Sequence, residues 1–195
     1  MISIRRALPA DAAAIAAVHV AAWRSAYAGL LPDGYLANLS ESRLTVFYRR
    51  NLLARQEGEA VFVAVAREGD ASLVVGFASG GRTRRIGMGR SGLAGSSGLA
   101  EGEVATLYVL DDWREHNLGR RLLRATAAHL AAIGCRSAML WVLSENPSRW
   151  FYQHLGGRRV AVETTRVGGS PVEQSAMLWD PISHLLAATA WADGA

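Results

Sequence analysis

The sequence predicts an α/β or α+β fold in which helices cover the faces of a β-sheet. Two observations favour it. Apolar runs of strand length alternate with helical patterns along the chain, and the 195 residues, 50% of them hydrophobic, are enough to bury a sizeable core in one domain. Charged residues make up 19% of the chain, and this low share together with the apolar content argues against a globally disordered protein.

The first third of the chain is predicted to form one strand and two helices. Residues 2–7 alternate apolar and polar side chains, as a half-buried strand does. Pro9 suits the first turn of a helix that runs to about residue 28. Gly29 and Pro32 then interrupt the helical pattern, and a second helical region covers about residues 42–56.

A hairpin and a long loop follow. Strands are expected at 60–67 and 72–79, because the Glu-Gly-Asp sequence between them favours a tight turn. Residues 80–102 are rich in Gly, Ser and Arg and are predicted to form a loop, since strong core patterns resume on both sides. Loops of this length inside a domain are usually functional or disordered.

The second half of the chain alternates strands with helices. We expect a buried strand, a long amphipathic helix, another buried strand, a short helix and two final strands, at 103–110, 117–133, 136–143, 146–155, 158–167 and 172–179. We therefore expect one domain over residues 1–180, followed by an Ala-rich tail at 181–195.

Composition excludes several kinds of chemistry. All 21 basic residues are Arg, so the chain has no P-loop, Schiff-base or kinase-type lysine. Cys135 is the single cysteine, which excludes an intramolecular disulfide and a zinc site built from several cysteines. The five His show no metal-ligand spacing, and no metal is expected. The net charge of +4 favours an anionic partner without identifying it.

The N-terminus does not read as a targeting or membrane segment. Pro9, Asp11 and His19 interrupt the Ala-rich run that begins the chain, and no stretch approaches the roughly 20 apolar residues that span a bilayer. We therefore expect a cytoplasmic protein without a membrane partner.

Residues 87–92 have the G-x-G-x-x-G spacing associated with dinucleotide binding. That motif works only when a strand precedes it and a helix follows it, so that the pyrophosphate meets the helix N-terminus. Neither flank here has such a pattern, and we exclude a Rossmann site.

Residues 107–123 have the flanking pattern that residues 87–92 lack: an apolar strand, a tight polar turn and then a helix. The first N–H groups of a helix have no internal partner and carry partial positive charge, so they form an anion site. Arg114 and Arg120 add full charges for a phosphate. Asn117 and Gly119 suit a turn that approaches a ligand closely or adopts left-handed geometry.

This segment resembles the Q/R-x-x-G-x-G/A cofactor-binding motif of the GCN5-related N-acetyltransferases (GNATs), with Arg114, Asn117 and Gly119 at its three positions. Residues 19–32 are similar to the opening helices of many bacterial members, and residues 140–157 to the later strand–helix motif. Asn117 departs from the preferred Gly. Because Asn tolerates the left-handed region better than most residues, we expect the turn to form.

The resemblance implies a GNAT-like mixed, mostly antiparallel sheet of six to seven strands. It also implies a V-shaped split between the fourth and fifth strands, near Val109 and Trp141, that admits acetyl-CoA as co-substrate. The residues that would bind the cofactor are then Leu107, Tyr108, Val109, Arg114, His116, Asn117, Leu118, Gly119, Arg120 and Asn146.

Acetyl transfer to an amine needs a neutral amine, a donor for the oxyanion and a donor for the leaving thiolate. The resemblance implies Glu103 as the base, with Glu101 or a water molecule as alternatives. It implies the backbone N–H of Val109 as the oxyanion donor and Tyr152 as the acid facing the thiolate.

The predicted activity is transfer of an acetyl group from acetyl-CoA to a primary amine of a small molecule, peptide or protein. Two alternatives stay open: a non-catalytic acyl-CoA-binding regulator on the same fold, and a nucleic-acid-binding protein. The latter would use the arginines of the Gly-rich segment, which are Arg82, Arg84, Arg85 and Arg90. That cluster lacks the interleaved aromatic residues typical of nucleic-acid sites, and we expect no nucleic-acid partner.

The acceptor and the oligomeric state are not readable from the sequence. The resemblance places the acceptor groove at about residues 23–36 and 80–102, which contain no cluster that selects one class of amine. Both a monomer and a homodimer stay open, because dimers are frequent in similar proteins.

Overall fold

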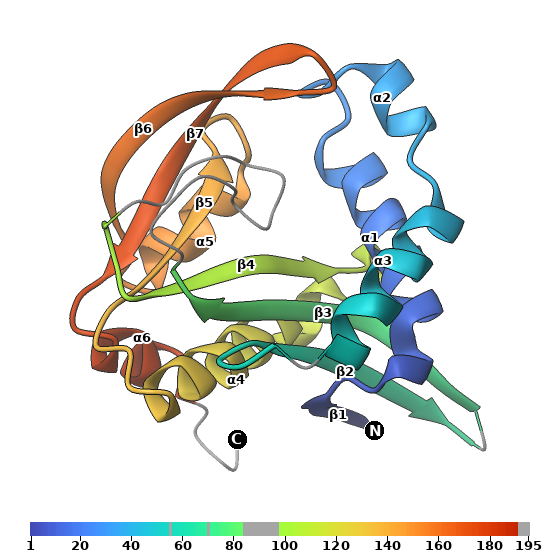
Figure 1. Ribbon diagram of the computed structural model, residues 1–195, viewed down its shortest axis with the longest axis horizontal. Coiled ribbons are helices and arrows are strands. Elements are labelled where there is room, and N and C mark those ends of the chain that lie inside the picture. The colour runs from blue at the N-terminus through green and yellow to red at the C-terminus, as the bar shows by residue number, and fades with distance from the viewer. Residues whose placement is uncertain (55, 70, 84–97, 191–195) are drawn as a thin grey trace.

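A seven-stranded sheet with the strand order β1-β2-β3-β4-β5-β7-β6 forms the centre of the computed structural model (Figure 1). The structure describes residues 1–54, 56–69, 71–83 and 98–190. The strands are β1 (Ile2–Arg6), β2 (Ala60–Glu68), β3 (Ala71–Arg82), β4 (Gly102–Val109), β5 (Ala138–Leu143), β6 (Arg158–Val167) and β7 (Ser170–Trp179). Neighbouring strands are antiparallel except β4 and β5, which are parallel. The predicted mixed, mostly antiparallel sheet is confirmed.

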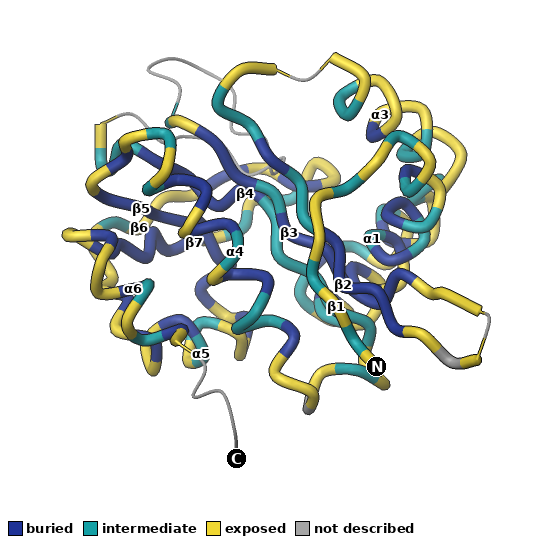
Figure 2. Tube along the Cα trace, turned by 90° about the horizontal axis from the view of Figure 1, so that it is seen from below, coloured by how far each residue is buried: buried dark blue, intermediate teal, exposed yellow. Residues whose placement is uncertain are grey.

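Helices cover both faces of this sheet. They are α1 (Ala12–Ala26), α2 (Asp33–Ala37), α3 (Glu41–Ala54), α4 (Leu118–Ala132), α5 (Ser148–His154) and α6 (Ser183–Ala188), with 3-10 turns η1 (Pro9–Asp11) and η2 (Asp111–His116). Because side chains alternate along a strand, Phe77 of β3 packs with α1 while the position of Gly76 beside it faces Leu122 of α4. Figure 2 shows the resulting buried layer along the strands and the inner side of α4, with exposed positions on the outer helix faces.

The sheet splits between β4 and β5. The two strands pair only at Gly102↔Ala138 and Glu103↔Met139, and they diverge beyond these residues. On its other edge β4 stays paired with β3 as far as Val109, and β5 stays paired with β7 along its whole length. Each strand is thus held by its outer neighbour while the edges that face each other are left open. The predicted split between the fourth and fifth strands is confirmed.

The predicted loop at 80–102 is wrong at its ends, because β3 continues to Arg82 and β4 begins at Gly102. A Cβ at Gly80 would lie 2.6 Å from Thr126 Cγ2 and 2.8 Å from the Glu103 carbonyl oxygen. Glycine is therefore needed here for close packing inside a strand, whereas its composition suggested a loop. The G-x-G-x-x-G spacing at 87–92 lies outside the described residues.

Two short helices lie where the sequence predicted a chain break and a tail. We expected only a chain break around Pro32, but α2 begins directly after it, as proline at a helix start allows. In the expected tail, α6 packs against α4, and two arginines of α4 hold its C-terminal carbonyl groups. Arg120 donates to Ala188 O at 2.5 Å and Arg124 to Leu186 O at 2.6 Å. Among the described residues, no helix combines the length and apolar character that crossing a membrane requires.

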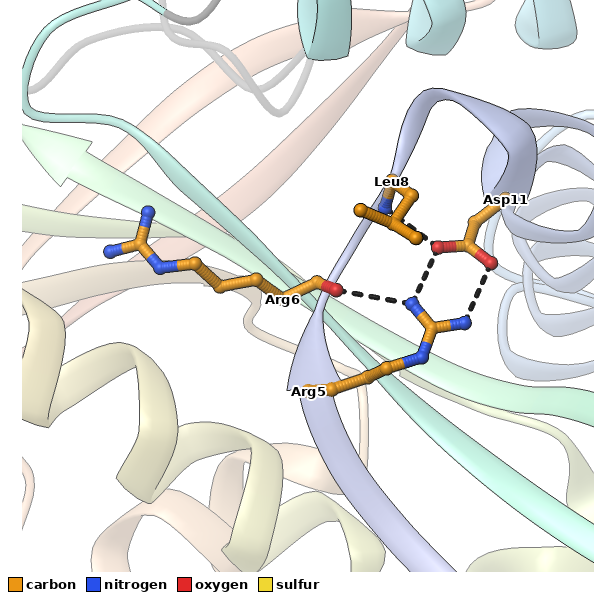
Figure 3. A network of polar contacts seen from close by, with 4 residues as sticks. All are labelled: Arg5, Arg6, Leu8 and Asp11. Atoms are coloured by element: carbon orange, nitrogen blue, oxygen red, sulfur yellow. Dashed lines mark hydrogen bonds and ion pairs between the residues drawn. The ribbon is translucent and has the colours of Figure 1, made fainter.

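An ion pair joins β1 to the start of α1 (Figure 3). Arg5 Nη1 and Nη2 donate to the two carboxylate oxygens of Asp11 at 2.7 and 2.9 Å, and the Leu8 N–H donates to Asp11 Oδ2 at 2.7 Å. The hydrogen bonds from Arg5 lower the pKa of the Asp11 carboxyl. This contact fixes where α1 begins, and α1 is the helix that reaches the site described next.

Candidate active site

A cavity of about 500 Å³ opens where β4 and β5 diverge. Its walls are residues 104–109 of β4 on one side and 140–142 of β5 on the other. Tyr27 directly after α1, Gly119 at the start of α4 and Tyr152 of α5 complete it. The split in the sheet therefore holds a concave site between helices of both faces, as ligand sites usually do.

Among the described residues, the β4 wall of this first cavity pairs with no strand on its cavity side beyond Glu103. The N–H of Leu110 donates to Val75 O at 2.9 Å, so this edge of the chain faces β3. Because N–H groups alternate in direction along a strand, the N–H groups of Leu107 and Val109 point the other way, toward the cavity. They are ready donors for a carbonyl oxygen held there.

The far end of the first cavity is the N-terminus of α4. Asn117 has φ +55° and precedes the helix; it is the one residue other than glycine with positive φ among the described residues. The motif prefers glycine here, and we expected Asn117 to permit the same left-handed geometry. Within the helix, the first N–H bonded back is that of Arg121, at 3.1 Å to Asn117 O, so the preceding N–H groups remain available to an anion.

The two arginines of the motif both line the first cavity, and each already has a partner. Arg114 forms an ion pair with Asp111 at 2.6 Å, and Asp111 also accepts a hydrogen bond from Ser25 Oγ. Arg120 uses Nη2 to hold Ala188 O, while its buried Nε has no partner among the described residues. An unsatisfied buried donor at the cavity wall is what an anionic ligand would satisfy.

Most of the predicted cofactor-binding residues line this cavity, and two do not. His116 is exposed, with its ring 5.4 Å from that of Trp113. The Leu118 side chain is fully buried in the core, so that only its backbone N–H at the helix start can face a ligand. The residues that do line it are Leu107, Tyr108, Val109, Arg114, Asn117, Gly119, Arg120 and Asn146.

The two acidic candidates differ sharply in surroundings. Glu103 is 8% exposed and lies on β4 where the split closes, opposite Met139 of β5. Glu101 lies at the surface, where both the backbone N–H and the guanidinium of Arg136 bind its carboxylate, each at 2.8 Å. These contacts lower the pKa of Glu101. Neither acid lines the first cavity, and the catalytic role of Glu103 stays a prediction.

Buried tyrosines gather around the split. Burial raises the pKa of Tyr152 well above its ordinary value, as it does for Tyr27 and Tyr108. All three phenols are therefore protonated at neutral pH and can donate a hydrogen bond. The Tyr27 oxygen takes hydrogen bonds from the side chains of Tyr108 and Asn146, which partly offset the rise in its pKa.

Asn146 lies just before the start of α5. Its Oδ1 accepts the N–H of Ser148, the first residue of α5, at 2.8 Å. Because α5 carries Tyr152 and Asn146 also contacts Tyr27, this residue ties the α5 wall of the first cavity to the α1 wall.

A second cavity, of about 780 Å³, shares one lining residue with the first, Thr106 of β4. His19 and Trp23 of α1 line it together with Phe47 and Tyr48 of α3. His19 Nδ1 lies 2.7 Å from the Tyr48 hydroxyl, and the His19 ring stacks on Trp23 with centroids 5.1 Å apart. Burial lowers the pKa of His19 to about 4. The second cavity thus has an aromatic wall with a neutral imidazole at neutral pH.

Comparison with known proteins decides the family. The model of the acetyltransferase (GNAT) family matches residues 20–156, which is most of the chain. The chain belongs to the GNAT family. Its similarity to the uncharacterized N-acetyltransferase YuaI of Bacillus subtilis is 31% identity over 185 residues, covering 95% of this chain and 96% of the relative.

Two further similar proteins extend the comparison. The aminoglycoside N(6')-acetyltransferase type 1 of Stenotrophomonas maltophilia is 33% identical over 134 residues, which cover 69% of this chain and 71% of that enzyme. The structure of YncA from Salmonella typhimurium with its cofactor acetyl-CoA has a TM-score of 0.63 and 22% identity, covering 92% of this chain and 94% of YncA. The resemblance inferred from the sequence is confirmed.

Sequence reasoning missed several groups at the site. The indole of Trp141 lines the first cavity, and its buried Nε1 has no partner among the described residues. Phe151, Ser148 and His154 of α5 line the same cavity. The helical region predicted at 42–56 corresponds to α3, but nothing in its sequence indicates that it faces a second cavity. Within the described residues, no group of three His, Cys, Asp or Glu side chains is placed to hold a metal ion.

Proposed function

We propose that this GNAT protein is an N-acetyltransferase that moves the acetyl group of acetyl-CoA to a primary amine by direct attack on the thioester. The observation that carries the proposal is the first cavity. It combines inward-facing N–H groups on β4, the N-terminus of a 15-residue helix and a buried tyrosine. The acetyl-CoA in the related YncA structure, and the amine acceptors named for the Stenotrophomonas relative, support the same reading.

Cofactor binding divides between the two ends of the first cavity. The pyrophosphate would lie at the α4 N-terminus, held by backbone N–H groups around Leu118 and Gly119 and by the side chains of Arg114 and Arg120. The pantetheine arm would run along β4, where Leu107 offers a free N–H. Asn146 offers a polar side chain at the α5 wall.

The chemical step needs three groups. The amine nitrogen attacks the thioester carbon, and the N–H of Val109 donates to the oxygen that becomes negative. The C–S bond then breaks, and the Tyr152 hydroxyl donates a hydrogen bond to the departing thiolate, which takes its proton from solvent. Because burial raises its pKa, Tyr152 stays protonated throughout and can donate this hydrogen bond. The amine attacks the thioester directly, so no acyl-enzyme is required. The proton that the nitrogen carries in excess after the attack passes to a base.

Glu103 is the better candidate for that base. The Arg136 contacts that lower the pKa of Glu101 make its carboxylate a weak proton acceptor, and they also hold it at the surface. Glu103 is buried on the strand that carries the cofactor wall. A water molecule between Glu103 and the amine would complete the route, since Glu103 does not line the first cavity.

The two rival functions have distinct tests. A non-catalytic acyl-CoA-binding regulator would use the same cavity without turnover. The nucleic-acid hypothesis depends on four arginines, of which Arg82 already donates to Ile133 O. The other three lie outside the described residues. Binding to DNA or RNA that falls steeply with salt and is lost on deleting residues 84–97 would revive that hypothesis.

The deciding experiment incubates the protein with acetyl-CoA and a broad panel of amines while free thiol release is followed. Turnover with an amine supports the proposed function. Calorimetric binding of acetyl-CoA without turnover across the panel would favour the regulator, and absence of binding would contradict both. A cytoplasmic location and a homodimer stay predictions from the sequence.

A further inference from the structure

The second cavity is placed to deliver a molecule to the first. Along α1, Ala22 and Ala26 line the first cavity, whereas His19 and Trp23, on the neighbouring stripe of the same helix, line the second. Thr106, whose hydroxyl is 2.7 Å from Ser79 Oγ, is the one described residue that lines both cavities. If a thioester lies along β4, as the proposed function requires, an amine in the second cavity reaches it past Thr106.

Aromatic rings form much of the wall of the second cavity. Trp23, Tyr35, Phe47 and Tyr48 line it together with the His19 imidazole. Such faces stabilise apolar and aromatic bodies by dispersion, and they accept one cation over a ring. Contact with them also desolvates an ammonium group and lowers its pKa, which favours the neutral amine that the reaction needs.

The charged groups of this wall cancel. Among the described residues that line the second cavity, Arg6 is the one arginine and Glu59 the one acid, and Glu59 has a partner already. The histidines add no charge at neutral pH, because burial lowers the pKa of both His19 and His129. Residues 84–97, wherever they lie, contribute three arginines and no acid. The wall therefore has no set of carboxylates to match a polycation.

We infer that the second cavity holds the acceptor and selects a monoamine carried on an aromatic or aliphatic body against polyamines and aminoglycosides. Every further ammonium group of a polycation would lose water beside apolar rings without gaining a carboxylate, which is costly. This inference rests on the proposed function for the site and goes beyond it in naming the acceptor class. It also separates this chain from its Stenotrophomonas relative, whose name gives an aminoglycoside as substrate.

The test compares kcat/KM for 2-phenylethylamine, spermidine and kanamycin with acetyl-CoA saturating. We expect 2-phenylethylamine to be preferred by at least about tenfold, the size of effect that a matched apolar pocket gives. Equal or greater kcat/KM for spermidine or kanamycin would overturn the acceptor class while leaving the acetyltransferase itself in place.

Paired variants of α3 locate the site. Phe47 is 49% exposed and lines the second cavity, whereas Val46 beside it is 69% exposed and does not. Phe47→Glu should raise KM for 2-phenylethylamine about tenfold and lower it for spermidine, because the new carboxylate suits a polycation. Val46→Glu, with the same change of charge, should leave both values unchanged, and neither variant should alter acetyl-CoA affinity. Equal responses of the two variants would contradict the location.

A direct binding measurement keeps the inference separate from the proposed function. If no amine is acetylated, calorimetric titration with 2-phenylethylamine still reports on the second cavity. Binding that Phe47→Glu weakens and Val46→Glu preserves would show that the second cavity takes an aromatic monoamine even though the enzymatic proposal had failed. No binding of 2-phenylethylamine by a folded protein would overturn it.

Discussion

The two cavities on either side of Thr106 are built from different kinds of group. The first is walled by backbone donors on β4, a helix N-terminus and arginines, which suit a long anionic molecule of fixed structure. The second is walled by rings from α1 and α3 with charges that cancel. Backbone donors depend on the path of the chain, whereas ring walls depend on side chains. The fold therefore determines the binding groups of the first cavity, whereas single substitutions can change the ligand preference of the second.

The sharpest test of the first cavity is Gly119→Glu. The added carboxylate would stand at the helix end that we assign to the pyrophosphate, where it adds bulk and repulsion. We expect acetyl-CoA affinity to fall by about a thousandfold, or roughly 4 kcal/mol, measured by calorimetry.

Gly119→Ala is the matched control. A Cβ at this position would lie 3.6 Å from Phe151 Cζ, an ordinary van der Waals distance. The alanine variant should therefore bind acetyl-CoA within a few-fold of the wild type. Unchanged affinity in the glutamate variant would show that the pyrophosphate binds elsewhere.

Tyr152→Phe separates chemistry from binding in the same cavity. It keeps the buried ring and removes the hydroxyl assigned to the thiolate. We expect kcat to fall about a hundredfold, as for the loss of one hydrogen-bond donor to a developing negative charge, with acetyl-CoA affinity nearly unchanged. Thermal unfolding of the variant serves as a control for the fold. An unchanged kcat would remove Tyr152 from the mechanism.

What could be predicted from the sequence alone differs in the same way between sites built from backbone and sites built from side chains. The strand–turn–helix around Asn117 was predictable, because the anion site depends on local backbone geometry and on residue types that permit it. The split of the sheet followed from resemblance. Local pattern did not reveal that Arg114 would be paired with Asp111, nor that Arg120 would hold α6, since both depend on residues brought close only by turns and tertiary packing.

The second cavity could not be predicted from local sequence pattern for a related reason. The expected acceptor groove at 23–36 includes Tyr35, which does line this cavity, but Phe47 and Tyr48 come from the helical region predicted at 42–56, to which no site was assigned. Gly80 was misread because a glycine required by close packing and a glycine in a loop look alike in sequence. Long-range packing, not composition, decides both cases.

The neutral wall of the second cavity predicts a pH dependence of stability. The folded pKa of His19, about 4, lies below the ordinary value of 6.5, so between these values the unfolded chain binds a proton that the folded chain does not. The free energy of unfolding therefore decreases as pH falls from 6.5 toward 4, by roughly 2 kcal/mol at pH 5 from this residue.

His19→Gln should remove this contribution. Urea unfolding at pH 7 and pH 5 would show a smaller loss of stability in the variant than in the wild type, while other titrating groups contribute equally to both. Identical losses would mean that the imidazole is hydrated and titrates normally in the folded protein.

The smallest expected effect concerns Asp11, which fixes the start of the helix that reaches both cavities (Figure 3). Asp11→Asn keeps an oxygen for the Leu8 N–H and removes the charge that Arg5 binds, so the free energy of unfolding should fall by about 1 kcal/mol at pH 7. Because the folded pKa of Asp11 is lowered, its contribution is present above the ordinary carboxyl pKa and is lost as pH falls through the folded value. A double-mutant cycle with Arg5→Gln measures the coupling, and strictly additive losses would show that the ion pair does not hold α1 in place.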